Sequence, residues 1–178
     1  MHEIHLTHGN KEAIYQQLLP QIESLISEEP SLIANLANIA AVLKTAFDWL
    51  WVGFYLEDAQ RHELVLGPFQ GPVACTRIPY GRGVCGQAWA GRKTIVVSDV
   101  NVYPDHIACS SLSQSEIVVP IFDTQHDSLI AVLDVDADTL NRFDDTDSAY
   151  LGKLAALIAQ QHSKSETTDT IKADVKPL

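Results

Sequence analysis

The clearest strand signal in the sequence is Ser115-Glu116-Ile117-Val118-Val119-Pro120-Ile121-Phe122, followed after a short turn by Leu129-Ile130-Ala131-Val132-Leu133-Asp134-Val135. Both runs are apolar and rich in β-branched residues, which is typical of strands. The segment between them, Asp123–Ser128, is polar and is expected to be the turn. Two strands joined this closely pair antiparallel, because a parallel pair needs a long crossover connection.

Four more short strands are predicted upstream of this hairpin. They cover Trp49–Glu57, Glu63–Leu66, Cys75–Ile78 and Thr94–Val97, with Gly67-Pro68 expected in a loop. Roughly six consecutive strands with few helices between them favour an antiparallel sheet that carries helices on its faces. The sequence therefore predicts an α+β or three-layer fold.

Helices are predicted at both ends of the chain, where apolar residues recur every three to four positions. The expected ranges are Lys11–Ile26, Leu32–Phe47 and Thr146–Gln161, with a short helix over Val84–Ala90 in the middle of the chain. Pro20 lies inside the first range and is expected to kink or break that helix.

The chain has 178 residues, and at roughly 100–200 residues per domain this length favours one domain. Residues 1–162 show no internal repeat and no linker, so we expect them to form a single domain that includes the N-terminal helices. Residues 163–178 are polar with balanced charges and are expected to be a disordered tail.

The charge balance of 12 Lys and Arg against 23 Asp and Glu gives a net charge of −11. So acidic a chain is a poor binder of nucleic acid or of anionic membranes. The first residues lack the basic and apolar regions of a secretory signal, and no run reaches the ~20 apolar residues of a spanning helix. A cytoplasmic location is therefore expected, where thiols are kept reduced.

The three cysteines stand at loops or at the ends of elements. Three is an odd number, so a closed set of structural disulfides cannot use them all, and no C-x-x-C pair supports a zinc or thioredoxin-like site. Cys109 lies in the polar loop Asp99–Ser113 and is expected to be accessible. Cys75 follows a Gly/Pro loop, and Cys85 stands near a helix N-terminus, a position that lowers thiol pKa values. The alternative is that these are small buried apolar residues.

Two carboxylates share one face of the last strand, because Asp134 and Asp136 are two residues apart. Glu116 precedes the neighbouring apolar run and is predicted to point to the same face. Such a cluster forms either a polar pocket in which at least one pKa is raised, or a solvated strand end. Trp51 and Tyr55 also share a face, either as core residues or as the wall of a ligand pocket.

Two weaker patterns carry little support. Gly81-x-Gly83-x-x-Gly86 has the spacing of a nucleotide-binding turn but lacks the flanking βαβ unit and the acidic ribose partner. His106 and Cys109 are three residues apart, but two candidate ligands do not make a zinc site. We therefore expect neither a bound cofactor nor a metal.

Several segments together resemble GAF domains, specifically the free methionine-(R)-sulfoxide reductases, from about Ala34 to His162. The segments that carry the resemblance are Trp51–Tyr55, Cys75–Pro79, Gly81–Gly86, Ile95–Val100, Pro104–Cys109, Ser113–Pro120 and Leu133–Asp136. All three cysteines of the family are present, and most GAF domains lack them. The resemblance implies a GAF fold with a central six-stranded, mainly antiparallel sheet and helices packed on its faces.

The resemblance also implies a function, the reduction of free methionine (R)-sulfoxide, with thioredoxin as reductant and a homodimeric assembly. Cys109 matches the nucleophile, Cys75 the main resolving cysteine, and Cys85 a third cysteine that can also enter a disulfide. Three acidic residues match the pocket around the sulfoxide oxygen and two aromatic residues match its wall: Glu116, Asp134, Asp136, Trp51 and Tyr55. The alternative is a GAF ligand-binding or thiol redox-sensor module.

Overall fold

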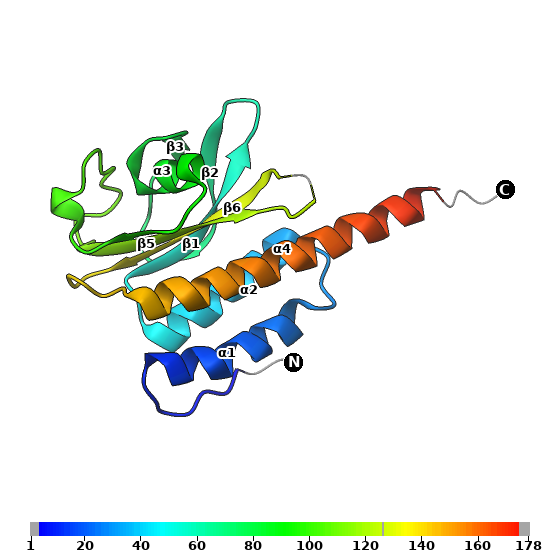
Figure 1. Ribbon diagram of the computed structural model, residues 1–178, viewed down its shortest axis with the longest axis horizontal. Coiled ribbons are helices and arrows are strands. Elements are labelled where there is room, and N and C mark those ends of the chain that lie inside the picture. The colour runs from blue at the N-terminus through cyan, green and yellow to red at the C-terminus, as the bar shows by residue number, and fades with distance from the viewer. Residues whose placement is uncertain (1–3, 126, 175–178) are drawn as a thin grey trace.

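The computed structural model describes residues 4–125 and 127–174, and for 165–174 the backbone alone. Its helices are α1 (Lys11–Ile26), α2 (Leu32–Phe47), α3 (Gly83–Gly91) and α4 (Asp145–Asp174), with a 3-10 turn η1 (Val100–Val102). Its strands are β1 (Trp51–Asp58), β2 (Glu63–Gln70), β3 (Arg77–Pro79), β4 (Ile95–Val97), β5 (Ser115–Phe122) and β6 (Leu129–Ala137) (Figure 1).

The strands form one six-stranded sheet in the order β3-β2-β1-β6-β5-β4. Every neighbouring pair is antiparallel, so the predicted antiparallel sheet is confirmed. The predicted hairpin of residues 115–135 supplies β5 and β6. These strands occupy inner positions, and β6 pairs with both β1 and β5.

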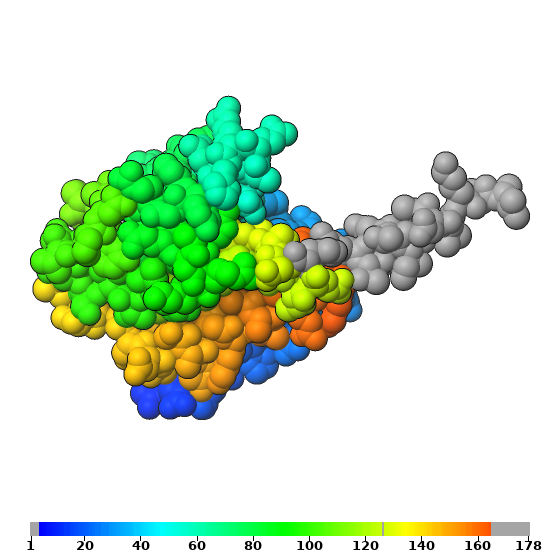
Figure 2. All heavy atoms as spheres, turned by 45° about the horizontal axis from the view of Figure 1, so that its top comes forward, coloured from blue at the N-terminus to red at the C-terminus, as the bar shows by residue number. Residues whose placement is uncertain are grey.

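Helices α2 and α4 cover one face of the sheet, with α1 packed on their outer side, and α3 with the long loops covers the other face (Figures 1 and 2). Alternate residues of the inner strands enter two different cores. Leu133 and Val135 pack under the three long helices, whereas Val118 and Val132 pack under α3. Burial on both faces explains why these strands read as nearly continuous apolar runs.

Two prolines stand inside regular elements: the break allowed for at Pro20 does not occur, and Pro68 is not in the predicted loop. Pro20 lies inside α1 without ending it. Its side chain is exposed, as is Gln16, the residue whose carbonyl group loses its helical partner. Pro68 lies inside β2 and not in a loop, next to a register shift in the β1–β2 ladder. Bulges and edges are the places where a strand tolerates proline.

Helix α4 also differs from the expectation, because its backbone stays helical to Asp174, through most of the range predicted to be a disordered tail. Residues 175–178 of that range lie outside the described residues. Within the described part of the chain, no helix combines the length and the apolar character needed to cross a bilayer.

Candidate active site

A pocket of about 540 Å³, counted with its open mouth, lies on the α3 side of the sheet. All but one of the eight predicted site residues line it: Trp51, Tyr55, Cys85, Cys109, Glu116, Asp134 and Asp136. The eighth, Cys75, lies beside the pocket and is bonded to Cys109. Strands β1, β5 and β6, helix α3 and the loop before β5 thus bring together residues that are up to 85 positions apart in the sequence.

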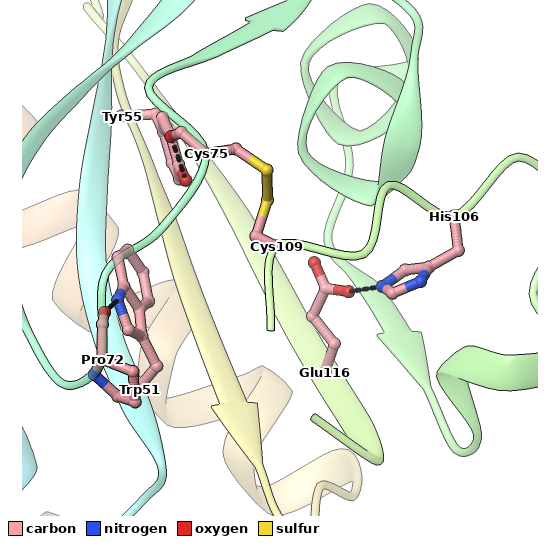
Figure 3. Close-up of a disulfide and its surroundings, with 7 residues drawn as sticks. All are labelled: Trp51, Tyr55, Pro72, Cys75, His106, Cys109 and Glu116. Atoms are coloured by element: carbon pink, nitrogen blue, oxygen red, sulfur yellow. Dashed lines mark hydrogen bonds and ion pairs between the residues drawn. A yellow bond between two sulfur atoms is a disulfide. The ribbon is translucent and has the colours of Figure 1, made fainter. Parts of the chain in front are cut away.

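Cys75 and Cys109 form a disulfide across 34 residues of sequence, with their Cα atoms 5.1 Å apart (Figure 3). Both residues are half-buried and both stand in loops, one before β3 and one before β5. Cys85 is the free thiol and is buried. The expectation that Cys109 is accessible is met only in part, because its loop packs against the pocket.

The three carboxyl groups converge because of the strand register. Glu116 on β5 lies opposite Asp136 on β6, and Asp134 is two residues away on the same face. Glu116 and Asp134 are 5% and 7% exposed, so the predicted polar pocket is realised and the solvated strand end is not. Burial is the largest cause of a raised pKa in all three groups, which for Asp136 reaches about 6.

The environment of Cys85 reverses the expectation drawn from its helix position. A helix N-terminus stabilises a thiolate by roughly 0.3–1 kcal/mol, less than one pKa unit. Desolvation acts in the opposite direction and reaches several units for buried groups. In this protein burial comes first, and the nearby Asp134 and Glu116 carboxylates add to it, so the pKa of Cys85 is raised well above 9.0.

Two aromatic rings form the wall of the pocket. Trp51 and Tyr55 lie 6.0 Å apart between ring centroids, at an interplanar angle of 27°. Trp51 Nε1 donates to the Pro72 carbonyl oxygen at 3.1 Å, and the Tyr55 hydroxyl donates to the Cys75 carbonyl oxygen at 3.0 Å (Figure 3). The wall thus holds the loop that carries one of the bonded cysteines.

The loop that carries Cys109 is fastened by residues that sequence reasoning did not single out for this role. Arg82 donates two 2.7 Å hydrogen bonds to the two carboxylate oxygens of Asp105. Gly83 has φ +59°, and a Cβ there would meet Ile107 at 3.0 Å. His106 Nε2 lies 3.5 Å from Glu116 Oε2 (Figure 3). All these residues belong to the segments that carried the family resemblance, and that was the available signal.

Cys85, Glu116 and Asp134 are also the kind of donor set that can hold a metal ion, since one ligand atom from each lies within 4.8 Å of the others. Burial raises the pKa of all three groups, which favours their protonated forms. A metal would have to displace those protons.

Residues 31–161 match the GAF domain family. The chain is 57% identical to a free methionine-R-sulfoxide reductase from Neisseria meningitidis, solved in complex with its substrate, with a TM-score of 0.91 over 94% of this chain and 99% of that one. It is 43% identical to the Escherichia coli free methionine-R-sulfoxide reductase over 90% of this chain and 93% of that protein. It is likewise 43% identical to the Saccharomyces cerevisiae enzyme of that name, over 84% of this chain and 86% of that protein.

These matches span nearly the full length of the relatives and include the strands and loops that build the pocket. The resemblance inferred from short motifs is therefore confirmed over most of the chain. The chain belongs to the GAF-domain free methionine-R-sulfoxide reductases.

Proposed function

We propose that the chain reduces free L-methionine (R)-sulfoxide in this pocket, with Cys109 as nucleophile and Cys75 as resolving thiol. The observation that carries the proposal is the Cys75–Cys109 disulfide beside a cluster of buried carboxyl groups. A pair of sulfurs that can bond, next to groups that retain protons, is what the chemistry requires. Membership of the reductase family favours this function over a ligand-binding or redox-sensor module.

The first step transfers oxygen from one sulfur to another. The Cys109 thiolate attacks the sulfoxide sulfur, the sulfoxide oxygen takes up a proton, and methionine leaves while Cys109 becomes a sulfenic acid. The Cys75 thiol then condenses with the sulfenic acid, which forms the disulfide and releases water. The sulfoxide sulfur gains the two electrons that the cysteine pair loses.

The carboxyl groups serve as the proton source. An acid of ordinary pKa would be ionised near neutral pH and could not protonate the oxygen. Burial and mutual repulsion raise the pKa of Glu116 and of Asp134 well above the usual range. Like charges this close cannot all ionise at low cost, so the cluster retains at least one transferable proton.

The shape of the pocket favours a free amino acid over a peptide. Trp51 and Tyr55 offer ring faces and edges to a thioether side chain, and sulfur makes favourable contacts with aromatic rings. Loop residues line the pocket on either side, among them Val73 and Ile107. A residue within a polypeptide would have to bring its flanking chain into the same pocket.

The disulfide must be reduced before the next cycle, and we propose thioredoxin as the external dithiol. Cys75 and Cys109 are both half-buried, so one sulfur can be attacked from outside. A dithiol supply of this kind is typical of the cytoplasm, which is the location we propose. The homodimer implied by the family resemblance is a prediction that light scattering after size exclusion tests.

A stereospecific assay tests the function. Purified protein with thioredoxin, thioredoxin reductase and NADPH should consume free methionine (R)-sulfoxide and leave the S form and a methionine-sulfoxide peptide unreacted. Cys109→Ser should abolish turnover, whereas Cys75→Ser should release about one methionine per chain and then stop. Full steady-state turnover by Cys109→Ser would overturn the assignment.

A further inference from the structure

Cys85 stands in a different environment from the other two cysteines. It is 3% exposed, and its sulfur lies within 4.8 Å of carboxylate oxygens of Glu116 and Asp134. Cys75 and Cys109 are bonded to each other in the same structure. The Cys85 sulfur thus faces the acid cluster, while the other two sulfurs complete the redox pair without it.

The protonation of Cys85 suits a hydrogen-bond donor better than a redox thiol. The thiolate is the form that attacks a disulfide or a sulfenic acid. Burial and the neighbouring carboxylates raise the pKa of Cys85, which disfavours that form. The neutral S–H group has the Asp134 carboxyl group close by, because the Cys85 sulfur lies within 4.8 Å of an Asp134 carboxylate oxygen.

Asp134 needs such a partner because it is buried and incompletely bonded. Its Oδ1 atom lies out of contact with solvent and receives no hydrogen bond, and the residue lines the pocket. A buried carboxyl group needs contacts that fix its orientation. Glu116 stands beside Asp134 on β5, and Cys85 approaches it from α3.

We propose that Cys85 is a positioning residue, whose thiol donates a hydrogen bond that orients Asp134 toward the substrate, and that its sulfur is not needed as a redox centre. This inference rests on the proposed reduction of free methionine (R)-sulfoxide in the same pocket. It gives Cys85 a role, whereas the redox cycle of Cys75 and Cys109 leaves this third cysteine without one.

Two substitutions separate the roles. Cys85→Ser keeps a hydrogen-bond donor of similar size but cannot form a disulfide, and Cys85→Ala removes both properties. Each protein is reduced with dithiothreitol, desalted and mixed with free methionine (R)-sulfoxide in a single turnover. Serine should keep the wild-type rate within about twofold, whereas alanine should lower it roughly three- to tenfold. In all three proteins the mapped disulfide should be Cys75–Cys109.

The pH profile adds a readout that loss of packing would not move. The charged and titratable groups around Asp134 come from β1, β5, β6, α3 and the loop before β5: Tyr55, Glu116, Asp136, Cys85 and His106. The hydrogen bond from Cys85 lowers the pKa of Asp134. Its removal therefore shifts the alkaline limb of the single-turnover rate to higher pH in Cys85→Ala, and leaves it in place in Cys85→Ser.

The outcomes are distinct. Equal losses in the serine and alanine variants, or a disulfide that includes Cys85 during wild-type turnover, would overturn the positioning role, as would an alanine variant with wild-type rate and pH profile. Cys85→Val, which has no donor but fills more volume, replaces alanine if that variant unfolds. Failure of the proposed function itself is recognised separately, because wild-type protein would then release no methionine.

Discussion

Glu116 and Asp136 lie directly opposite each other on the neighbouring strands β5 and β6. Like charges at opposed positions of a sheet are destabilising, and here Glu116 is buried and Asp136 half-buried. The pair persists because one of the two groups can keep its proton: Asp136 raises the pKa of Glu116, in addition to the effect of burial, so the protonated form of Glu116 is favoured. A feature that costs stability at neutral pH is thus what keeps an acid available in the pocket.

The first prediction is a loss of stability as pH rises. The pKa of Asp136 is raised from 3.8 to about 6, so the folded state binds more protons than the unfolded state within that interval. The contribution of Asp136 to the free energy of unfolding is fully present below pH 3.8 and is lost as pH rises through about 6. The loss from this group is on the order of 3 kcal/mol. Asp136→Asn should flatten the fall in unfolding free energy between these two pH values, measured by urea denaturation.

The control is Asp138→Asn, which replaces an exposed carboxylate just beyond β6. It should retain the wild-type pH dependence. If Asp136→Asn shows the same fall in unfolding free energy as Asp138→Asn, the buried acid cluster does not govern stability in this pH range.

The sequence predicted the elements whose signal is local. The bounds of Lys11–Ile26 and Ser115–Phe122 agree with the structure because periodicity and alternation are read within one segment. Pro68 was misassigned because its tolerance depends on a bulge against β1. Whether Pro68 can stand inside a strand is decided by the pairing with β1, which the sequence around Pro68 does not reveal.

The candidate site divides in the same way. Strand alternation correctly placed Asp134 and Asp136 on one face. The expected lowering of the Cys85 pKa was wrong. The nearby helix terminus is visible in the sequence, whereas the carboxylates that raise the pKa come from strands 31 or more residues away. Electrostatic properties that depend on burial and on distant neighbours follow only from the folded structure.

The second prediction concerns the helical layer. Lys11 Nζ on α1 lies 2.5 Å from Asp147 Oδ2 on α4, and the Asp147 side chain is fully buried. Tyr15 donates a 2.9 Å hydrogen bond to the same carboxylate. Lys11→Met should cost about 3 kcal/mol of unfolding free energy, because it leaves a buried charge without its cation. The double variant Lys11→Met/Asp147→Asn should recover much of that loss in urea denaturation. A double variant as unstable as the single one would contradict this account.

The third prediction concerns the fork between Arg82 and Asp105, which fastens the Cys109 loop to α3. Arg82→Ala should slow formation of the Cys75–Cys109 disulfide after substrate by roughly three- to tenfold, since the loop samples more positions. Arg82→Lys should form the disulfide at a rate between those of the wild-type protein and Arg82→Ala, because an ammonium group cannot bind both carboxylate oxygens in a fork. Quenched-flow alkylation followed by mass mapping measures the rate.

Arg92→Ala is the matched control for Arg82→Ala. Arg92 forms an ion pair with Asp127 in the β5–β6 turn, and neither residue lines the pocket. Its loss removes one arginine of similar exposure and leaves the Cys109 loop fastened. A slowing as large in Arg92→Ala as in Arg82→Ala would show that the effect is a general weakening of α3 and not a loss of loop position.

The last prediction separates the two chemical steps through Tyr55. Its hydroxyl donates a 3.0 Å hydrogen bond to the Cys75 carbonyl oxygen, so the ring contributes to the pocket wall while the hydroxyl holds the resolving cysteine. Tyr55→Phe keeps the ring and removes the donor. Disulfide formation should therefore slow more than methionine release, by roughly threefold or more. Rapid quenching with separate quantification of methionine and free thiols measures both rates.

Tyr150→Phe is the control, because it loses a hydroxyl of the helical layer that bonds Glu12, and it should change neither rate. Equal slowing of both steps in Tyr55→Phe would mean that the hydroxyl acts on the substrate and not on the position of Cys75.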